Sequence, residues 1–164
     1  MRLSNPGSAL SGWAGRRRAQ SLVEFGLILP VTLIILLGMV DFGRAYVYGV
    51  AVQQGAREGV RMGITASILG NPSNTNQLMM QRTIDASRPA MTGCTAPTSG
   101  ASMTCTDGTG ISWTITVAPS GTKSSGQTVR VTATGQMPLL VGFLTGLFGI
   151  SSINLQGDAR MVVL

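Results

Sequence analysis

Residues 16–40 read RRRAQSLVEFGLILPVTLIILLGMV, and this stretch decides the fold. The run from Phe25 to Val40 carries no charge. Counted from Gln20, the segment is about 31 Å long as a helix, which is about the thickness of the hydrocarbon core of a bilayer. Glu24 lies just inside it, although a carboxylate in lipid costs several kcal/mol at depth. We therefore predict a membrane-spanning helix, about residues 22–42, in which Glu24 has a compensating partner.

Arginines set the predicted orientation of this span. Arg2 and the triplet 16–18 precede it, with no acidic residue among them. An excess of basic residues on one side of a span favours the cytoplasm for that side. A secreted protein with a cleaved signal peptide is the competing interpretation. Because the sequence after Val40 offers no clear small-x-small cleavage site in a polar context, we favour a retained anchor with a cytosolic leader (1–19) and an external C-terminal domain.

Glu24 itself has two interpretations. Ser21 and Glu24 have capping-box spacing, in which Ser21 caps a helix and Glu24 bonds back to its amide. Alternatively, a cut between Ala19 and Gln20 would make Glu24 the fifth residue of a mature chain. The new α-amino group would be cationic and would stand one helical turn from that carboxylate, in its own or a neighbouring subunit. We favour the second interpretation, because leader, small residue, Glu24-Phe25 and apolar run occur together.

The chain resembles the TadE-like pilus proteins of the bacterial tight-adherence system. The resemblance rests on RRAQSLVEF (17–25), LP (29–30), GMVDFGR (38–44) and AREGVR (56–61). It implies a pseudopilin cut by a prepilin peptidase after Ala19, with Glu24 as the required carboxylate and Phe25 beside it. Ala19 stands where the family more often has glycine. The implied partners are the prepilin peptidase, other pilins and the inner-membrane lipid.

Composition agrees with a small envelope protein. Charged residues make up 11% and hydrophobic residues 44% of the 164 residues. Lys123 is the sole lysine, and no basic cluster with aromatic partners suggests nucleic-acid binding. Histidine is absent and the external acidic residues are scattered, so we expect no catalytic, cofactor-binding or metal site.

Beyond the membrane, the helical pattern continues, giving one long helix over residues 20–68. Gly55, Gly59 and Gly63 form a stripe of small residues spaced by four, which permits close helix contact. Each would cost about 1 kcal/mol against alanine in an exposed helix. The stripe is therefore either a packing surface or the place where the protein's own sheet lies close, and the sequence favours neither.

Residues 69–164 form the predicted external domain. A turn at residues 70–74 precedes a short helix, about residues 77–87, and a loop over residues 89–110. That loop holds Cys94 and Cys105, for which a disulfide is the simplest arrangement outside the cytoplasm, and free thiols are the alternative.

Alternating apolar and polar residues predict strands in residues 111–117, 129–133 and 153–164, the last bulged at Gly157. A hairpin loop over residues 119–126 would place Lys123 at a solvated tip. The apolar run 138–150 is too short for an ordinary span; a buried connection is favoured over a loop that enters the membrane or docks on a partner. The fold class is α+β and pilin-like: a long N-terminal membrane helix whose outer half packs on a mainly antiparallel sheet of about three strands.

Three functions are compatible with this organisation. The first is a minor pilin that is cleaved, extracted from the membrane and packed with other pilins in pilus biogenesis and surface adherence. The second is an uncleaved, membrane-resident assembly factor. The third is an anchored module whose Thr-rich sheet binds an external ligand. All three place the chain in the bacterial cytoplasmic membrane, and the first also in an extracellular pilus.

Overall fold

The computed structural model describes residues 11–70, 72–140, 149 and 151–164, in two units. Residues 1–40 make up the first unit and residues 41–164 the second. The described elements are two helices, α1 (Ser11–Ile68) and α2 (Thr75–Ala86), and four strands, β1 (Ser102–Thr106), β2 (Ser112–Ala118), β3 (Thr128–Pro138) and β4 (Ser152–Val162).

In the first unit, most apolar side chains of α1 from residue 20 onward are exposed. Leu22, Leu27 and Met39 are 72%, 71% and 66% exposed. This part of α1 is long and apolar enough to cross a membrane, and none of its most apolar window is buried within the protein. Such a surface is unfavourable in water but is the expected surface of a helix in lipid. It indicates a single-pass membrane anchor.

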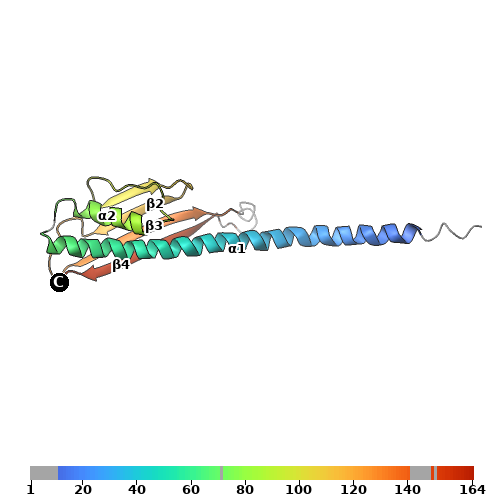
Figure 1. The fold of residues 1–164 in the computed structure, drawn as a ribbon, viewed down its shortest axis with the longest axis horizontal. Coiled ribbons are helices and arrows are strands. Elements are labelled where there is room, and N and C mark those ends of the chain that lie inside the picture. The colour runs from blue at the N-terminus through green and yellow to red at the C-terminus, as the bar shows by residue number, and fades with distance from the viewer. Residues whose placement is uncertain (1–10, 71, 141–148, 150) are drawn as a thin grey trace, which may run out of the picture. The chain divides into compact units, whose positions relative to one another are not determined.

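The second unit contains a four-stranded antiparallel sheet in the order β1-β2-β3-β4 (Figure 1). The predicted α+β class is confirmed, with one strand more than expected. The additional strand, β1, lies within the predicted loop 89–110. Its five residues alternate in burial, with Met103 buried between exposed Ser102 and Thr104. Five residues in a segment rich in Ser, Thr and Gly hold too few apolar positions for their alternation to predict a strand. The strand forms because these residues pair with β2.

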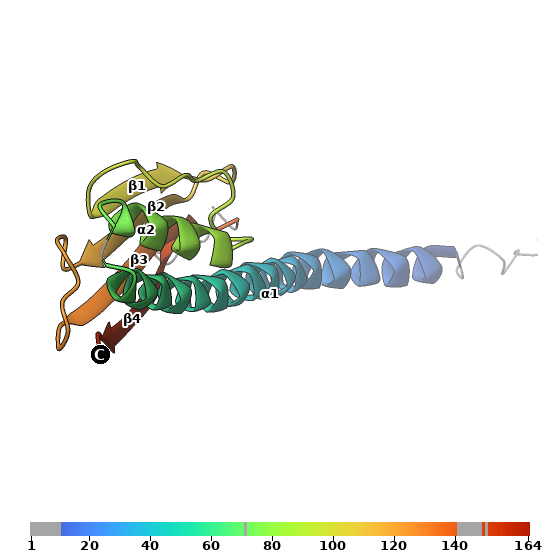
Figure 2. The same ribbon diagram turned by 60° about the vertical axis from the view of Figure 1, so that its left-hand side comes forward.

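Both helices cover the same face of the sheet (Figures 1 and 2). The covered face carries every second residue of the strands, including Trp113, Ile115, Val129 and Val131, all completely buried. Helix α1 contributes an apolar stripe at Val52, Ala56 and Val60, and α2 contributes Met79, Met80 and Ile84. The opposite face is polar, as is usual for an antiparallel sheet with one covered face.

Gly157 is not a bulge, so that prediction is wrong. Strand β4 pairs with β3 without interruption, and Gly157 lies opposite Ala133. A Cβ at Gly157 would lie 2.5 Å from the carbonyl oxygen of Val52 in α1. The glycine is required because the helix backbone crosses the strand here with no room for a side chain.

Lys123 is not at a solvated tip, so that prediction is also wrong. It is 1% exposed. Its Nζ donates hydrogen bonds to Asn76 Oδ1 (2.7 Å), the Pro119 carbonyl (2.6 Å) and the Gly121 carbonyl (2.7 Å). Burial lowers the pKa of the ammonium group. The two loop carbonyls point toward the ammonium group, and together with the Asn76 oxygen they replace water around its charge. Because Asn76 belongs to α2, its hydrogen bond attaches the loop to the start of that helix.

The apolar run 138–150 falls mostly outside the described residues. Where its start is described, the backbone amide of Leu140 donates to both carboxylate oxygens of Asp41, at 3.0 and 3.2 Å. Asp41 is 3% exposed, and Arg44 lies 3.7 Å from it. The buried carboxylate thus attaches the beginning of this run to α1. The choice between burial and a membrane-entering loop rests on residues that are not described.

Candidate functional site

The predicted processing residues Ala19, Gln20, Glu24 and Phe25 all lie within α1. The side chains of Gln20, Glu24 and Phe25 are exposed. Gln20 and Glu24 are one turn apart on the same face of the helix. The Gln20 side-chain amide donates a hydrogen bond to the Glu24 carboxylate at 3.4 Å. The carboxylate therefore reaches back to the residue that would begin a mature chain.

The capping-box interpretation of Glu24 does not hold in the uncut chain. A cap stands at the first turn of a helix, where backbone amides lack partners. Ser21 lies well inside α1, which begins at Ser11. Only a cut before Gln20 would bring Ser21 and Glu24 to a helix N-terminus. Among residues 20–70, 72–140 and 151–164, whose side chains are described, no arginine or lysine forms an ion pair with Glu24.

The glycine stripe packs against α2 of the same chain. A Cβ at Gly55 would lie 2.6 Å from the Thr83 carbonyl oxygen, and one at Gly59 would lie 3.1 Å from the Met79 carbonyl oxygen. At Gly63 the neighbours are Met79 and Val129 of β3. The stripe thus allows two helix backbones to approach closely. Its nearest neighbour is the short helix that the sequence predicted but did not identify as the partner of the stripe.

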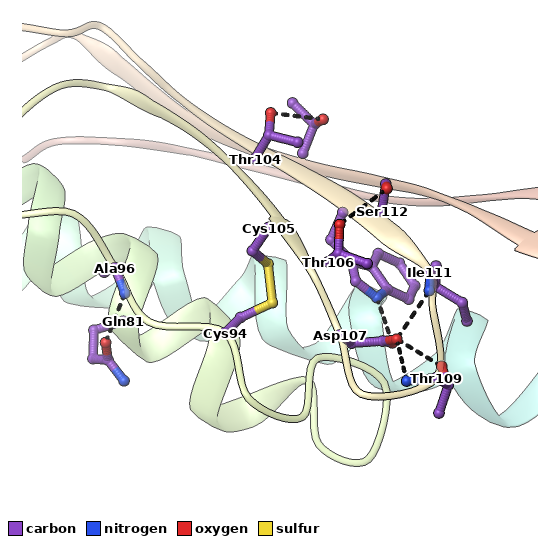
Figure 3. Close-up of a disulfide and its surroundings, with 12 residues drawn as sticks. Gln81, Cys94, Ala96, Thr104, Cys105, Thr106, Asp107, Thr109, Ile111 and Ser112 are labelled. Atoms are coloured by element: carbon purple, nitrogen blue, oxygen red, sulfur yellow. Dashed lines mark hydrogen bonds between the residues drawn. A yellow bond between two sulfur atoms is a disulfide. The ribbon is translucent and has the colours of Figure 1, made fainter.

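Cys94 and Cys105 are joined by a disulfide (Figure 3). It links the segment after α2 to the edge strand β1. In the chain-entropy model, closing a loop of this length stabilises the fold by about 3 kcal/mol. The bond is compatible with an oxidising compartment for the external domain.

Next to the disulfide, Asp107 organises the turn between β1 and β2 (Figure 3). Its carboxylate accepts hydrogen bonds from the Thr109 and Ile111 amides (2.8 and 3.0 Å), the Thr109 hydroxyl (2.6 Å) and Trp113 Nε1 (2.9 Å). Burial by itself would raise the pKa of Asp107, but these hydrogen bonds outweigh it and lower the pKa. The only sequence signal was an Asp-Gly pair, which is typical of turns.

Gln53 has a structural role that the sequence did not indicate. Its side-chain amide donates to the Asp158 carbonyl (2.8 Å) and accepts from the Asp158 amide (3.2 Å). The side chain thereby pairs with the backbone of edge strand β4 as a neighbouring strand would. Asp158 in turn accepts from Arg130 Nε at 2.6 Å, an ion pair that raises the pKa of Arg130 and lowers that of Asp158.

A comparison with protein families supports the resemblance seen in the sequence. The model of the family described as TadE-like protein matches residues 19–61, which are less than half of the chain. The match begins at Ala19 and ends two residues before Gly63, so it includes the span and part of the glycine stripe. Searches of curated proteins and of solved structures gave no match. The resemblance to the TadE-like family is confirmed over these residues, and it supports a pilin-like protein associated with a Tad pilus.

Proposed function

We propose that this chain is a minor pilin, or pseudopilin, of a tight-adherence pilus that a prepilin peptidase processes between Ala19 and Gln20. The observation that carries the proposal is the position of Glu24. Its carboxylate is directed to Gln20, at the start of the segment that matches the TadE-like family. After cleavage, the α-amino group of Gln20 would be the cation nearest to this carboxylate.

Assembly follows from the same arrangement. Between packed helices in lipid, the dielectric is low and an ion pair is stronger than in water. A mature N-terminal amine that meets the Glu24 carboxylate of a neighbour would neutralise both charges and set the axial position of the two helices. The exposed apolar side chains of α1 supply the remaining contact area. On this proposal the leader faces the cytoplasm and the sheet lies outside.

The first prediction concerns the N-terminus. In a host that carries the matching peptidase, we expect the membrane-extracted protein to begin at Gln20. Intact-mass spectrometry measures this directly, and expression without the peptidase is the control. An intact leader in the presence of the peptidase would contradict the pilin proposal and favour an uncleaved assembly factor. A start beyond Val40 would instead identify a removed signal peptide.

The second prediction concerns assembly. Glu24→Gln keeps the size and the hydrogen-bonding atoms of the side chain but removes its charge. We expect the variant to enter the membrane normally and to recover at least fivefold less of the partner pilins on co-purification, because the amine of the neighbour then lacks a counter-charge. Gln20→Ala is the matched control, since it removes the observed hydrogen bond but leaves the carboxylate. Equal recovery with Glu24→Gln and wild type, at equal membrane abundance, would rule out the pairing role.

A further inference from the structure

The polar face of the sheet is hollowed toward the end at which β2 and β4 begin. The hollow has a volume of about 390 Å³ and crosses β2, β3 and β4. Its polar lining consists entirely of uncharged hydroxyl and amide side chains: Ser112, Thr114, Thr134, Gln136, Asn154 and Gln156. None of the residues that line this hollow is charged.

The two kinds of polar group in this hollow differ in their hydrogen bonding. The hydroxyls of β2 are engaged with β1, as in the pairs Thr104–Thr114 and Thr106–Ser112, both at 3.3 Å. In the described part of the chain, the amides of Gln136, Asn154 and Gln156 have no such partner. Each amide offers two donors and one acceptor oxygen, so three adjacent amides present both donors and acceptors to a ligand.

A second hollow, of about 490 Å³, lies against α1 and shares Gln156 with the first. It is lined by Tyr46, which is 67% exposed, and by Arg57. Arg61, Arg88 and Arg130 each form an ion pair with a carboxylate. Arg57 does so with none of the described residues. The second hollow therefore adds an uncompensated cation and an exposed aromatic ring to the amides.

The two hollows lie on either side of the edge strand β4 and share Gln156. We propose that they form one binding site, which passes around this edge, for an acidic oligosaccharide, a chain of sugars that carry carboxylates. The amides would bind sugar hydroxyls, which are likewise both donors and acceptors. The planar guanidinium of Arg57 would bind a carboxylate through two parallel hydrogen bonds. The Tyr46 ring offers an apolar surface with a polar tip to the less polar face of a sugar.

Charge supports this choice of ligand. Basic residues outnumber acidic ones in residues 41–164, so the external domain attracts an anionic polymer. A single free arginine beside neutral amides suits widely spaced carboxylates better than the dense charge of a polyphosphate backbone. The proposal goes beyond the proposed function, because it requires neither cleavage nor incorporation into a pilus.

The test uses the full chain in detergent micelles and tetragalacturonic acid as the probe, with its methyl ester as a neutral ligand of the same hydroxyl pattern. We expect ligand-observed NMR to detect the acid at millimolar concentration and to detect the ester much more weakly. Arg57→Gln should weaken binding of the acid by at least about tenfold, as expected for losing a charged hydrogen bond. Gln156→Ala should weaken binding as well, because this residue lines both hollows.

Arg160→Gln is the matched control, because it removes the same charge from an exposed position of β4 that lines neither hollow. It should leave binding within about twofold of wild type, as expected for a screened surface charge. If Arg57→Gln and Arg160→Gln weaken binding of the acid equally, general charge attraction explains the effect and the proposed site is wrong. Equal binding of acid and ester, or no binding of the acid, would also overturn it. Concentration-dependent self-association that Arg57→Gln abolishes would assign the second hollow to another copy of the chain instead.

Discussion

Gly157→Ala is expected to destabilise the external domain by about 3 kcal/mol, at the upper end of the usual cost of overpacking. The added Cβ would meet the Val52 carbonyl at 2.5 Å and the Gln53 amide nitrogen at 2.9 Å. These are backbone atoms of α1, so no side-chain rotation can relieve the contact. The helix has to move away from β4, and the Gln53–Asp158 hydrogen bonds break with it. Thermal unfolding followed by near-ultraviolet circular dichroism should show a melting temperature lower by roughly 10 °C.

Gly49→Ala is the control for this substitution. Gly49 lies in α1, the helix that Gly157 of β4 contacts, but a Cβ at Gly49 would have no neighbour within 4 Å. The same change should therefore raise stability by up to about 1 kcal/mol, because alanine favours a helix more than glycine does. If Gly157→Ala has the same melting temperature as wild type, α1 and β4 are not in close backbone contact at this point.

Asp107→Asn is expected to cost about 2–3 kcal/mol at neutral pH. The asparagine oxygen can still accept from Ile111 and Thr109, but its amide group would face the Trp113 indole N–H, leaving donors opposed and a buried donor unsatisfied. Chemical denaturation monitored by tryptophan fluorescence measures the loss. Asp85→Asn is the control. Asp85 accepts an exposed hydrogen bond from Gln81 and forms an exposed ion pair with Arg88, so the change should alter stability by less than about 0.5 kcal/mol.

The pH dependence of the same variant supplies an independent check. The folded state holds the pKa of Asp107 below its ordinary value of 3.8. The ionised carboxylate therefore contributes stability that is fully present above about pH 3.8 and is lost as the pH falls through the lower folded-state pKa. The difference between wild type and Asp107→Asn should shrink in that acidic range. A difference that stays constant down to the acid limit of folding would show that the charge of Asp107 is unimportant.

How far the fold could be predicted differs between elements for physical reasons. A long uncharged apolar run was sufficient to predict the membrane-spanning part of α1. For β2, β3 and β4 the 2-residue alternation of apolar and polar residues was sufficient. Strand β1 was missed, since five residues hold too few periods and its partner lies outside the segment. For the proposed site, Glu24 was identifiable because a lone carboxylate in an apolar run is conspicuous in any context.

Residues whose role depends on a distant neighbour could not be identified in the same way. Lys123 looked like a solvated loop residue, but three oxygens from two segments surround its ammonium group. Gly157 looked like a bulge, because a glycine inside a strand has several explanations and only the position of α1 selects one. The glycine stripe was ambiguous until α2 was seen to lie against it.

The sequence alone determined the membrane span, the α+β class and the position of Glu24, because each depends on the order of residues within one segment. Tertiary structure decided what the glycines contact, where Lys123 and Asp107 find their partners, and that Gln156 joins two hollows. Those features depend on distances between segments that lie far apart in sequence, as Gln53 and Asp158 do. The periodicity of apolar residues indicates which face of a helix or strand is covered. Which segment covers that face is decided only by the tertiary packing.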